Sequence, residues 1–382
     1  MEMENKKKRA ADLIMISVFV IFVFGFAAAL IIRNDKAFSE TENRNLAQKP
    51  DVNWQDIKDG KFSEGLENYI SDQLFAKDEL VTLKTDLDRL LGKSFQNGVY
   101  FVNDNGRIRY VQQYKENLTQ LKENVGCLND FAEGLDIPAD FVLVPNASMN
   151  MLSKLPAGAD CDDQAESIKY VESLVSGKIS FYPMTDVMSK NTDYYYKTDH
   201  HWNNDGAYAA VGEYLRQSGQ IAPNGQEYTA SGTGIRDFYG TLYSKAPTVF
   251  ADADEFVYDE KCCQAVSVEW VNEGKISDSI LDRSYLDKKD KYAAFFGGNF
   301  AQIRIKTGHE GERVLVLKDS YANAAMQFLM QQYSEVTMID LRYYHMQEKS
   351  VSELCREYGI DRVIMLYNLD FLNEDRNFVW LS

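Results

Sequence analysis

The sequence is short of the side chains that build disulfide frameworks and hold metals. Its 382 residues include only five cysteines and four histidines. Five is an odd number, and no two cysteines have the Cys-x-x-Cys spacing of many zinc sites. A disulfide-rich scaffold is therefore excluded, and we expect neither a metal nor any other cofactor.

Positive charge is also scarce. The chain has 41 Lys and Arg against 58 Asp and Glu, which gives a formal net charge of −17. A field of that sign repels the phosphates of nucleic acids and the headgroups of anionic lipids over long range. We expect no nucleic-acid partner, and the charge is typical of a soluble domain that is exported.

Long apolar runs are scarce too, and only one is long enough to cross a membrane. Residues 13–32 contain no charged side chain, and a helix of that length spans the hydrocarbon core of about 30 Å. Residues 6–9 are Lys-Lys-Lys-Arg, and basic clusters of this kind stay in the cytoplasm. We predict a single-pass cell-membrane protein with a cytoplasmic tail at 1–12, a transmembrane helix at 13–32 and the rest outside.

A cleaved signal peptide is the alternative for this segment, because it also combines a basic start with an apolar run. Three alanines at residues 27–29 offer small side chains for cleavage. The run is longer than the roughly 7–15 apolar residues of a signal peptide, which favours the anchor. Both alternatives export the remaining chain.

The exported chain begins with a polar stretch and an amphipathic helical pattern. Apolar residues recur at helical spacing from about 62 to 91, which predicts a stalk and helical neck over residues 33–95. The pattern then changes to alternation around an Asp-Asn-Gly turn at 104–106. A hairpin there is predicted to open a catalytic domain over residues 96–382.

Helical and strand patterns alternate in that domain, which indicates an α/β fold. Helices are predicted over 115–134, 164–176 and 204–215, and strands at 141–144 and 179–183. Residues 220–300 have no clear periodicity, and we expect short strands and long loops there.

The last third of the chain has the clearest pattern. Apolar runs predict buried strands at 313–317, 335–339 and 362–366, separated by helices near 323–332 and 350–358. Successive β-α units make such strands parallel, and ligands then bind beyond their carboxyl ends. The segments directly after the strands therefore matter most: Lys318-Asp319-Ser320, Asp340-Leu341-Arg342 and Tyr367-Asn368.

Ser320 follows the first of these strands and begins a helix. Its hydroxyl would face the crevice, where backbone N–H groups at the helix start could stabilise an oxyanion. This is a suitable position for a nucleophile. It is also a common position for a helix N-cap, and the local sequence leaves both roles open.

A serine nucleophile needs a base, and two of the four histidines stand together in the segment TDHHWN. Asp199 lies two residues before His201, so one loop could hold the carboxylate against the imidazole. A helix-capping Asp with surface histidines is one alternative, and an Asp/His metal site is another. No further His or Cys lies at ligand spacing, which weakens the metal site.

Arg342 and Asn368 end the two strands after that of Ser320. Either could complete an oxyanion hole or hold a substrate. Each also has a structural explanation, because Arg342 could pair with Asp340 and Asn368 could occupy a turn.

Four segments in order, SETENRNLAQKP, TDHHWNNDGAYAA, LKDSYANA and DLRYY, resemble the DHHW family, relatives of the AlgX and AlgJ alginate O-acetyltransferases. The resemblance covers nearly the whole exported chain. It implies a three-layer, flavodoxin-like α/β domain of the SGNH hydrolase type, circularly permuted so that the Asp/His segment precedes the Ser segment. It also implies acyl-ester transfer or hydrolysis on a cell-surface glycan.

The resemblance assigns roles by motif. It implies that Ser320 is the nucleophile, His201 the general base and Asp199 the partner of that base.

The resemblance also covers residues around the reacting groups. Asn368 matches the oxyanion residue of SGNH hydrolases, and Arg342 stands where those enzymes have a glycine. Tyr321 and Trp202 lie inside the matched segments and are further candidates for oxyanion or substrate binding.

Two motifs depart from those of ordinary SGNH hydrolases. The serine motif is K-D-S-Y rather than G-D-S, and the acid–base motif is D-x-H rather than D-x-x-H. AlgX-type proteins share both departures, which favours transfer over simple hydrolysis. The alginate proteins have D-T-H-W where this chain has D-H-H-W, so His200 is an alternative base.

We expect an O-acyltransferase, with acetyl as the expected group, that acts on an exported polysaccharide. The resemblance implies a multi-span membrane acyltransferase as the partner that supplies acyl groups. A carbohydrate esterase with the same triad is one alternative. A non-catalytic glycan-binding or assembly protein is another, in which tyrosines at 194–196 and 343–344 would stack on sugars.

The predicted topology can be tested on intact cells from which the wall has been removed. Added protease should degrade the domain that follows residue 33, because the basic flank keeps only the first residues inside. Full protection of that domain until the cells are lysed would overturn the predicted orientation.

Overall fold

The computed structural model describes residues 2–39, 41–42, 44–220, 234–344 and 349–381. The chain forms two compact units. The first contains residues 1–92 with 247–249, and the second contains residues 93–246 with 250–382.

The first unit is mainly helical. Its first helix, α1 (Glu2–Ile32), is long and apolar enough over Arg9–Ile32 to cross a membrane, by length and composition. The predicted N-terminal apolar helix is therefore confirmed. The remaining elements are β1 (Phe38–Ser39), β2 (Arg44–Asn45), α2 (Trp54–Lys58), α3 (Lys61–Gln73) and α4 (Lys77–Leu90).

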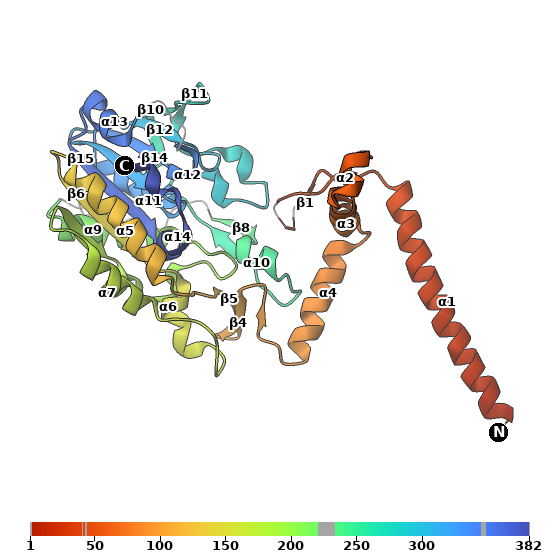
Figure 1. The fold of residues 1–382 in the computed structure, drawn as a ribbon. Helices are drawn as coiled ribbons and strands as arrows, with labels where there is room; N and C mark the ends of the chain where they lie inside the picture. The colour runs from red at the N-terminus through yellow and green to blue at the C-terminus, as the bar shows by residue number, and fades with distance from the viewer. Residues whose placement is uncertain (1, 40, 43, 221–233, 345–348, 382) are drawn as a thin grey trace. The chain divides into compact units, whose positions relative to one another are not determined.

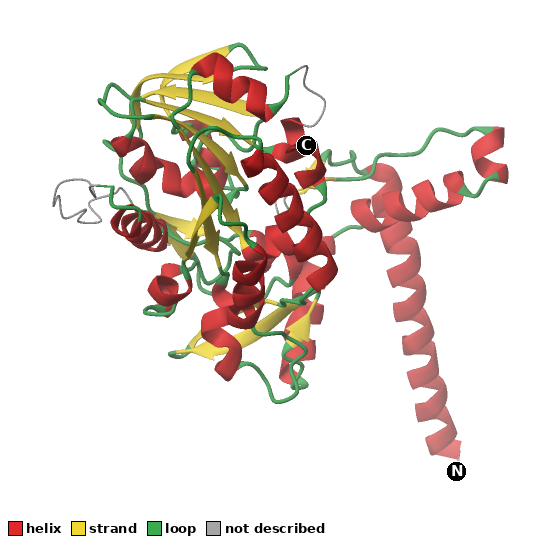
Figure 2. Cartoon of the chain, turned by 60° about the vertical axis from the view of Figure 1, so that its left-hand side comes forward, coloured by secondary structure: helices red, strands yellow, loops and turns green. Residues whose placement is uncertain are grey.

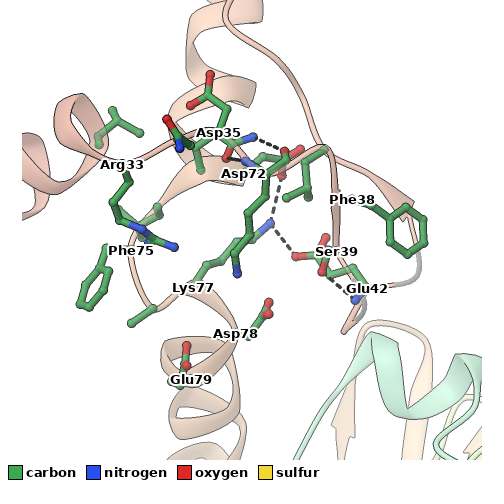
Figure 3. Close-up of a pocket in the computed structure, with 17 residues that line it drawn as sticks. Arg33, Asp35, Phe38, Ser39, Glu42, Asp72, Phe75, Lys77, Asp78 and Glu79 are labelled. Atoms are coloured by element: carbon green, nitrogen blue, oxygen red, sulfur yellow. Dashed lines mark hydrogen bonds and ion pairs between the residues drawn. The ribbon is translucent and has the colours of Figure 1, made fainter. Parts of the chain in front are cut away.

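Ion pairs hold the segment around β2 against the junction of α3 and α4. Arg44 Nη2 lies 2.5 Å from Asp72 Oδ1, and Lys77 Nζ lies 3.0 Å from the same atom and 2.5 Å from Glu42 Oε1. Figure 3 shows Lys77 between Asp72 and Glu42, in a cavity of about 330 Å³. The hydrogen bond from Arg44 holds the pKa of Asp72 below its usual range, so this carboxylate stays charged.

The second unit opens with a three-stranded antiparallel sheet of β3 (Phe95–Gln96), β4 (Val99–Asp104) and β5 (Arg107–Gln112). The turn between β4 and β5 has positive φ angles at Asn105 (55°) and Gly106 (83°), which these residue types tolerate. The predicted hairpin is therefore present at the predicted turn.

The large sheet of this unit has eight strands among the described residues, in the order β11-β10-β12-β14-β13-β15-β6-β7. Its strands are β6 (Ala139–Val144), β7 (Ile179–Pro183), β10 (Gln264–Trp270), β11 (Lys275–Ser279), β12 (Gln302–Lys306), β13 (Arg313–Lys318), β14 (Glu335–Ile339) and β15 (Arg362–Asn368). The five strands from β14 to β7 are parallel, as the β-α alternation predicted. The other three are antiparallel: β10 and β11 come from the region without periodicity, and β12 follows directly after it.

Helices cover both faces of the sheet. The helices of this unit are α5 (Leu118–Glu133), α6 (Ala147–Met151), α7 (Gln164–Leu174), α8 (Thr185–Met188), α9 (Asn204–Gln217), α10 (Thr241–Lys245), α11 (Tyr321–Leu329), α12 (Leu341–Tyr344), α13 (Val351–Tyr358) and α14 (Leu369–Glu374). Figure 1 shows α5 and α7 side by side, and Figure 2 shows the strands between helices. The second unit is therefore a three-layer α/β domain.

Alternate residues of the central strands enter separate cores. Val314 and Val316 of β13 pack in the cluster that contains α9 and α11, while Leu315 and Leu317 pack with α5, α7 and α13. Because both faces are buried, the strands read as continuous apolar runs in the sequence.

The described part of the region from 220 to 300 contains short strands, as expected. Besides β10 and β11 it holds β8 (Ile235–Phe238) and β9 (Asp254–Phe256), which pair with each other. Residues 221–233, which fall in the same predicted region, lie outside the described part. Apart from residues 247–249, the described part of the region belongs to the same unit as the parallel strands.

Candidate active site

Ser320 lies where β13 gives way to α11. It occupies the N-cap position of α11, yet its side chain makes no capping hydrogen bond. Its Oγ instead lies 2.8 Å from Nε2 of His201. The hydroxyl therefore faces the imidazole, and the capping role that the sequence left open is not what it does.

His201 is held by the carboxylate of Asp199. Asp199 Oδ1 lies 2.6 Å from His201 Nδ1 and also accepts a hydrogen bond from the His201 backbone N–H, at 2.9 Å. An ionised carboxylate only accepts hydrogen bonds, so Nδ1 carries the proton and Nε2 is left to accept from Ser320. The structure thus brings together the three residues that the sequence selected.

Asp199 is buried and fully hydrogen-bonded. Its Oδ2 accepts from the Thr241 backbone N–H at 2.7 Å and from Thr241 Oγ1 at 3.0 Å. Burial alone would raise the pKa of Asp199, but the adjoining histidines and these hydrogen bonds outweigh it and hold the pKa below its usual range. Asp199 therefore remains a carboxylate.

The loop that carries Asp199 is fixed by two charged side chains, those of Asp254 and the buried Arg109. The carboxylate of Asp254 accepts hydrogen bonds from the backbone N–H groups of Lys197 and Thr198, at 2.9 Å and 2.7 Å. Arg109 of β5 is fully buried and donates to the carbonyl of Tyr195 at 3.1 Å. These contacts satisfy loop backbone groups that would otherwise be buried without partners.

An aromatic ring fixes the plane of His201. The ring of Tyr292 stacks on the imidazole, with centroids 3.7 Å apart and planes 9° from parallel. The Tyr292 hydroxyl donates to the carbonyl of Ser320 at 3.0 Å. Tyr292 therefore contacts both His201 and Ser320.

Sequence reasoning missed Tyr292, Thr241 and Gly240. All three come from the region between 220 and 300, where the chain has no periodic pattern. Their roles depend on contacts with residues that are distant in sequence, so no local signal identifies them. The importance of Gly240 can be recognised only in the structure, where a Cβ at this position would lie 2.2 Å from the Cβ of Asp199.

The Ser320 hydroxyl opens into a cavity of about 520 Å³. The residues that line it are Gln112, His200, Thr241, Lys245, Asp319, Ser320, Tyr321, Arg342, Asn368, Asp370, Phe371, Glu374 and Asp375. Burial raises the pKa of Asp319 to about 6 and that of Asp370 to about 7. The cavity wall also has two cationic side chains, Lys245 and Arg342. Its cationic groups and its carboxyl groups can both bind hydroxyls.

Arg342 and Asn368 line this cavity at the ends of their strands. Arg342 donates to both oxygens of Asp340, at 2.9 Å and 2.6 Å, and its guanidinium lies 5.1 Å from the centre of the Phe371 ring. Asn368 Nδ2 donates to the carbonyl of Val144 at 3.0 Å. Both side chains are thus held rigidly beside the cavity, and the predicted ion pair of Arg342 is present.

Tyr321 and Trp202 are placed differently from each other. Tyr321 lines the cavity, and its hydroxyl donates to the carbonyl of His200. Trp202 is fully buried, is not among the lining residues, and donates from Nε1 to the carbonyl of Tyr321 at 3.0 Å. Trp202 therefore supports the loop from behind rather than facing a substrate.

The other histidines lie elsewhere or in other roles. His200 lines the cavity, but its Nδ1 lies 2.6 Å from Thr241 Oγ1 and His201 is the residue that meets Ser320. His309 pairs with Gln331, and His345 lies outside the described residues. Asp199, His200 and His201 offer possible metal-ligand atoms within 4.8 Å of one another. In this structure hydrogen bonds engage both ring nitrogens of His201 and Nδ1 of His200.

A family model described as DHHW protein matches residues 97–339. The chain belongs to the DHHW family. The resemblance noted in the sequence is therefore confirmed, and the DHHW segment itself is the loop that carries Asp199 and His201. No curated protein matches the chain.

Solved structures extend the family likeness to the fold. A DHHW family protein from Eubacterium siraeum is 21% identical, with 75% of this chain and 95% of that chain covered and a TM-score of 0.63. Bacillus cereus PatB1 with a sulfonyl adduct is 21% identical, with 74% and 99% covered and a TM-score of 0.60. At these identities the likeness shows a shared fold.

The missed glycine gives a test of the DHHW site. In Gly240→Ala the new Cβ would overlap the Asp199 side chain, including Oδ2 at 2.3 Å, and would push the carboxylate away from His201. We predict that the turnover of an activated ester falls about 100-fold, the cost of misplacing a catalytic group by about 1 Å. The measurement is kcat/KM with 4-nitrophenyl acetate.

Gly212→Ala is the matched control. Gly212 lies in α9, and a Cβ there would meet nothing within 4 Å. This variant should keep wild-type activity and fold at least as well, because Ala favours a helix over Gly. Equal activity in the two variants, with both folded by circular dichroism, would contradict the positioning role of Gly240.

Proposed function

We propose that this DHHW protein is an extracytoplasmic O-acyltransferase that transfers an acyl group, expected to be acetyl, to a hydroxyl of a cell-surface or exported polysaccharide. The observation that carries the proposal is the hydrogen-bonded series from Ser320 Oγ to His201 Nε2, at 2.8 Å, and from His201 Nδ1 to Asp199, at 2.6 Å. A hydroxyl, a base and a group that orients the base at these distances are the parts of an acyl-transfer site.

The first half of the reaction would load the serine. Ser320 Oγ attacks the carbonyl carbon of the donor ester while His201 Nε2 takes the hydroxyl proton. The tetrahedral intermediate then expels the donor alcohol, which leaves with that proton from His201. An acyl ester on Ser320 remains.

The second half would transfer the acyl group. A sugar hydroxyl attacks the acyl ester while His201 takes its proton, and the proton returns to Ser320 Oγ as that oxygen leaves. Asp199 does not take a proton in either half, but its charge stabilises the imidazolium that forms twice. The Tyr292 ring keeps the imidazole in one plane throughout.

Negative charge on the carbonyl oxygen also needs stabilising hydrogen bonds. The backbone N–H of Tyr321 is already bonded to Asp319, at 2.8 Å. We assign the oxyanion to the Ser320 backbone N–H and to the amide hydrogen of Asn368 that does not face Val144, with Arg342 supplying positive charge from the wall.

Transfer is preferred over hydrolysis on the motifs of the sequence. K-D-S-Y and D-x-H are the departures that this chain shares with AlgX-type proteins. The apolar helix α1 would keep the domain beside the membrane, where a multi-span acyltransferase partner could present acyl groups. The triad alone does not choose, because water and a sugar hydroxyl can both attack an acyl-enzyme.

The test uses the full chain in detergent with 4-nitrophenyl acetate as donor and a panel of neutral, amino-sugar and uronic-acid oligosaccharides. We predict acylated sugar as a product, in addition to free acid. Because nucleophile and base act as a unit, Ser320→Ala and His201→Ala should each remove most of the rate, and the double variant little more.

Two outcomes would contradict the proposal. If every oligosaccharide leaves the release of free acid unchanged and takes up no acyl group, the esterase alternative replaces transfer. If Ser320→Ala retains wild-type turnover of the ester, the serine is not the nucleophile.

A further inference from the structure

His200 is the second histidine of the DHHW segment, and the reaction described above does not use it. Its side chain is 32% exposed and lines the same cavity as Ser320. Its ring lies against that of His201, with centroids 3.8 Å apart. A polar ring in this position needs an explanation, because a purely structural neighbour of His201 would not have to face the cavity.

The hydrogen bonds of Thr241 fix which nitrogen of His200 carries the proton. Thr241 Oγ1 lies 3.0 Å from Asp199 Oδ2 and 2.6 Å from His200 Nδ1. The hydroxyl has a single hydrogen, and it must point at the ionised carboxylate, which cannot donate in return. His200 Nδ1 therefore donates to Thr241, and Nε2 carries the lone pair.

The lone pair of His200 is available to a ligand. Within the described chain Nε2 has no hydrogen-bond partner, and it is not among the buried polar atoms that lack one. A single carboxylate, that of Asp199, thus sets the same tautomer in both histidines. It acts on His201 directly and on His200 through Thr241.

We propose that His200 Nε2 binds the acyl acceptor, by accepting a hydrogen bond from a sugar hydroxyl and holding it beside the acyl ester on Ser320. The inference rests on the function proposed above and adds a division of work between the two histidines. His201 moves protons for both halves of the reaction, while His200 orients the alcohol of the second half.

His200 is suited to accept a hydrogen bond rather than to take a proton. Burial and the adjacent His201 lower the pKa of His200 and outweigh the carboxylate of Asp199, which raises it. Lys245 and Arg342 on the cavity wall also lower this pKa. The ring therefore stays neutral. The acceptor proton passes to His201, which already serves Ser320 and has Asp199 to stabilise its charged form.

Two substitutions separate the two nitrogens of His200. In His200→Asn the amide N–H can still donate to Thr241, but nothing replaces Nε2. In His200→Gln the longer side chain can place an amide oxygen near the position of Nε2. His309→Asn is the matched control, because His309 pairs with Gln331 and does not line the cavity.

The measurement is the ratio of acylated sugar to free acid, with the full chain in detergent, 4-nitrophenyl acetate as donor and the oligosaccharide that the wild type acylates. We expect His200→Asn to lower this ratio about tenfold, as loss of one hydrogen bond to the acceptor would. His200→Gln should recover part of the ratio, and His309→Asn should keep it.

The acylation step must be followed separately, from the burst of 4-nitrophenol without acceptor. A wild-type ratio in His200→Asn overturns the proposal, and so does a burst rate that falls as much as the ratio. If the wild type hydrolyses the ester through Ser320 but acylates no sugar, the transferase function itself fails. The wild type alone gives that result, so a failure of the transferase function is distinguished from a failure of the role of His200.

Discussion

The Asp199 carboxylate is the group on which the rest of the site depends. Burying a carboxylate without compensating hydrogen bonds costs on the order of several kcal/mol of folding free energy. Asp199 receives four, two from His201 and two from Thr241. Those bonds keep it ionised and set the tautomers of both histidines. The α/β fold then only has to bring one strand end, that of Ser320, to the free nitrogen of His201.

The elements that position Ser320 could be predicted because their signals are local. β13, β14 and β15 are buried on both faces, so they appear as unbroken apolar runs in the sequence. The carboxyl ends of parallel strands meet at one edge of the sheet, where ligands bind, so the sequence alone indicated Ser320 as a candidate site residue. The Asp199–His201 pair was also visible, since two residues of one loop can meet without help from the rest of the chain.

The supporting residues could not be predicted, because they act across long sequence separations. Thr241 donates the remaining hydrogen bonds to Asp199 from a helix that begins 42 residues further along the chain. Tyr292 reaches the His201 ring from a stretch without helical or strand periodicity. The antiparallel strands β10 and β11 come from the same stretch. The sequence also identified His200, but the tautomer of its ring follows only from the contact with Thr241.

The central claim is that Ser320 carries the acyl group between donor and acceptor. The most direct test is to quench the full chain seconds after mixing with 4-nitrophenyl acetate and to map the acetyl group by peptide mass spectrometry. If Ser320 carries the acyl group, acetyl should be found on the peptide that contains Ser320 and should be absent in Ser320→Ala. It should also be lost faster when an acceptor oligosaccharide is added. Acetylation confined to another residue while turnover continues would contradict this claim.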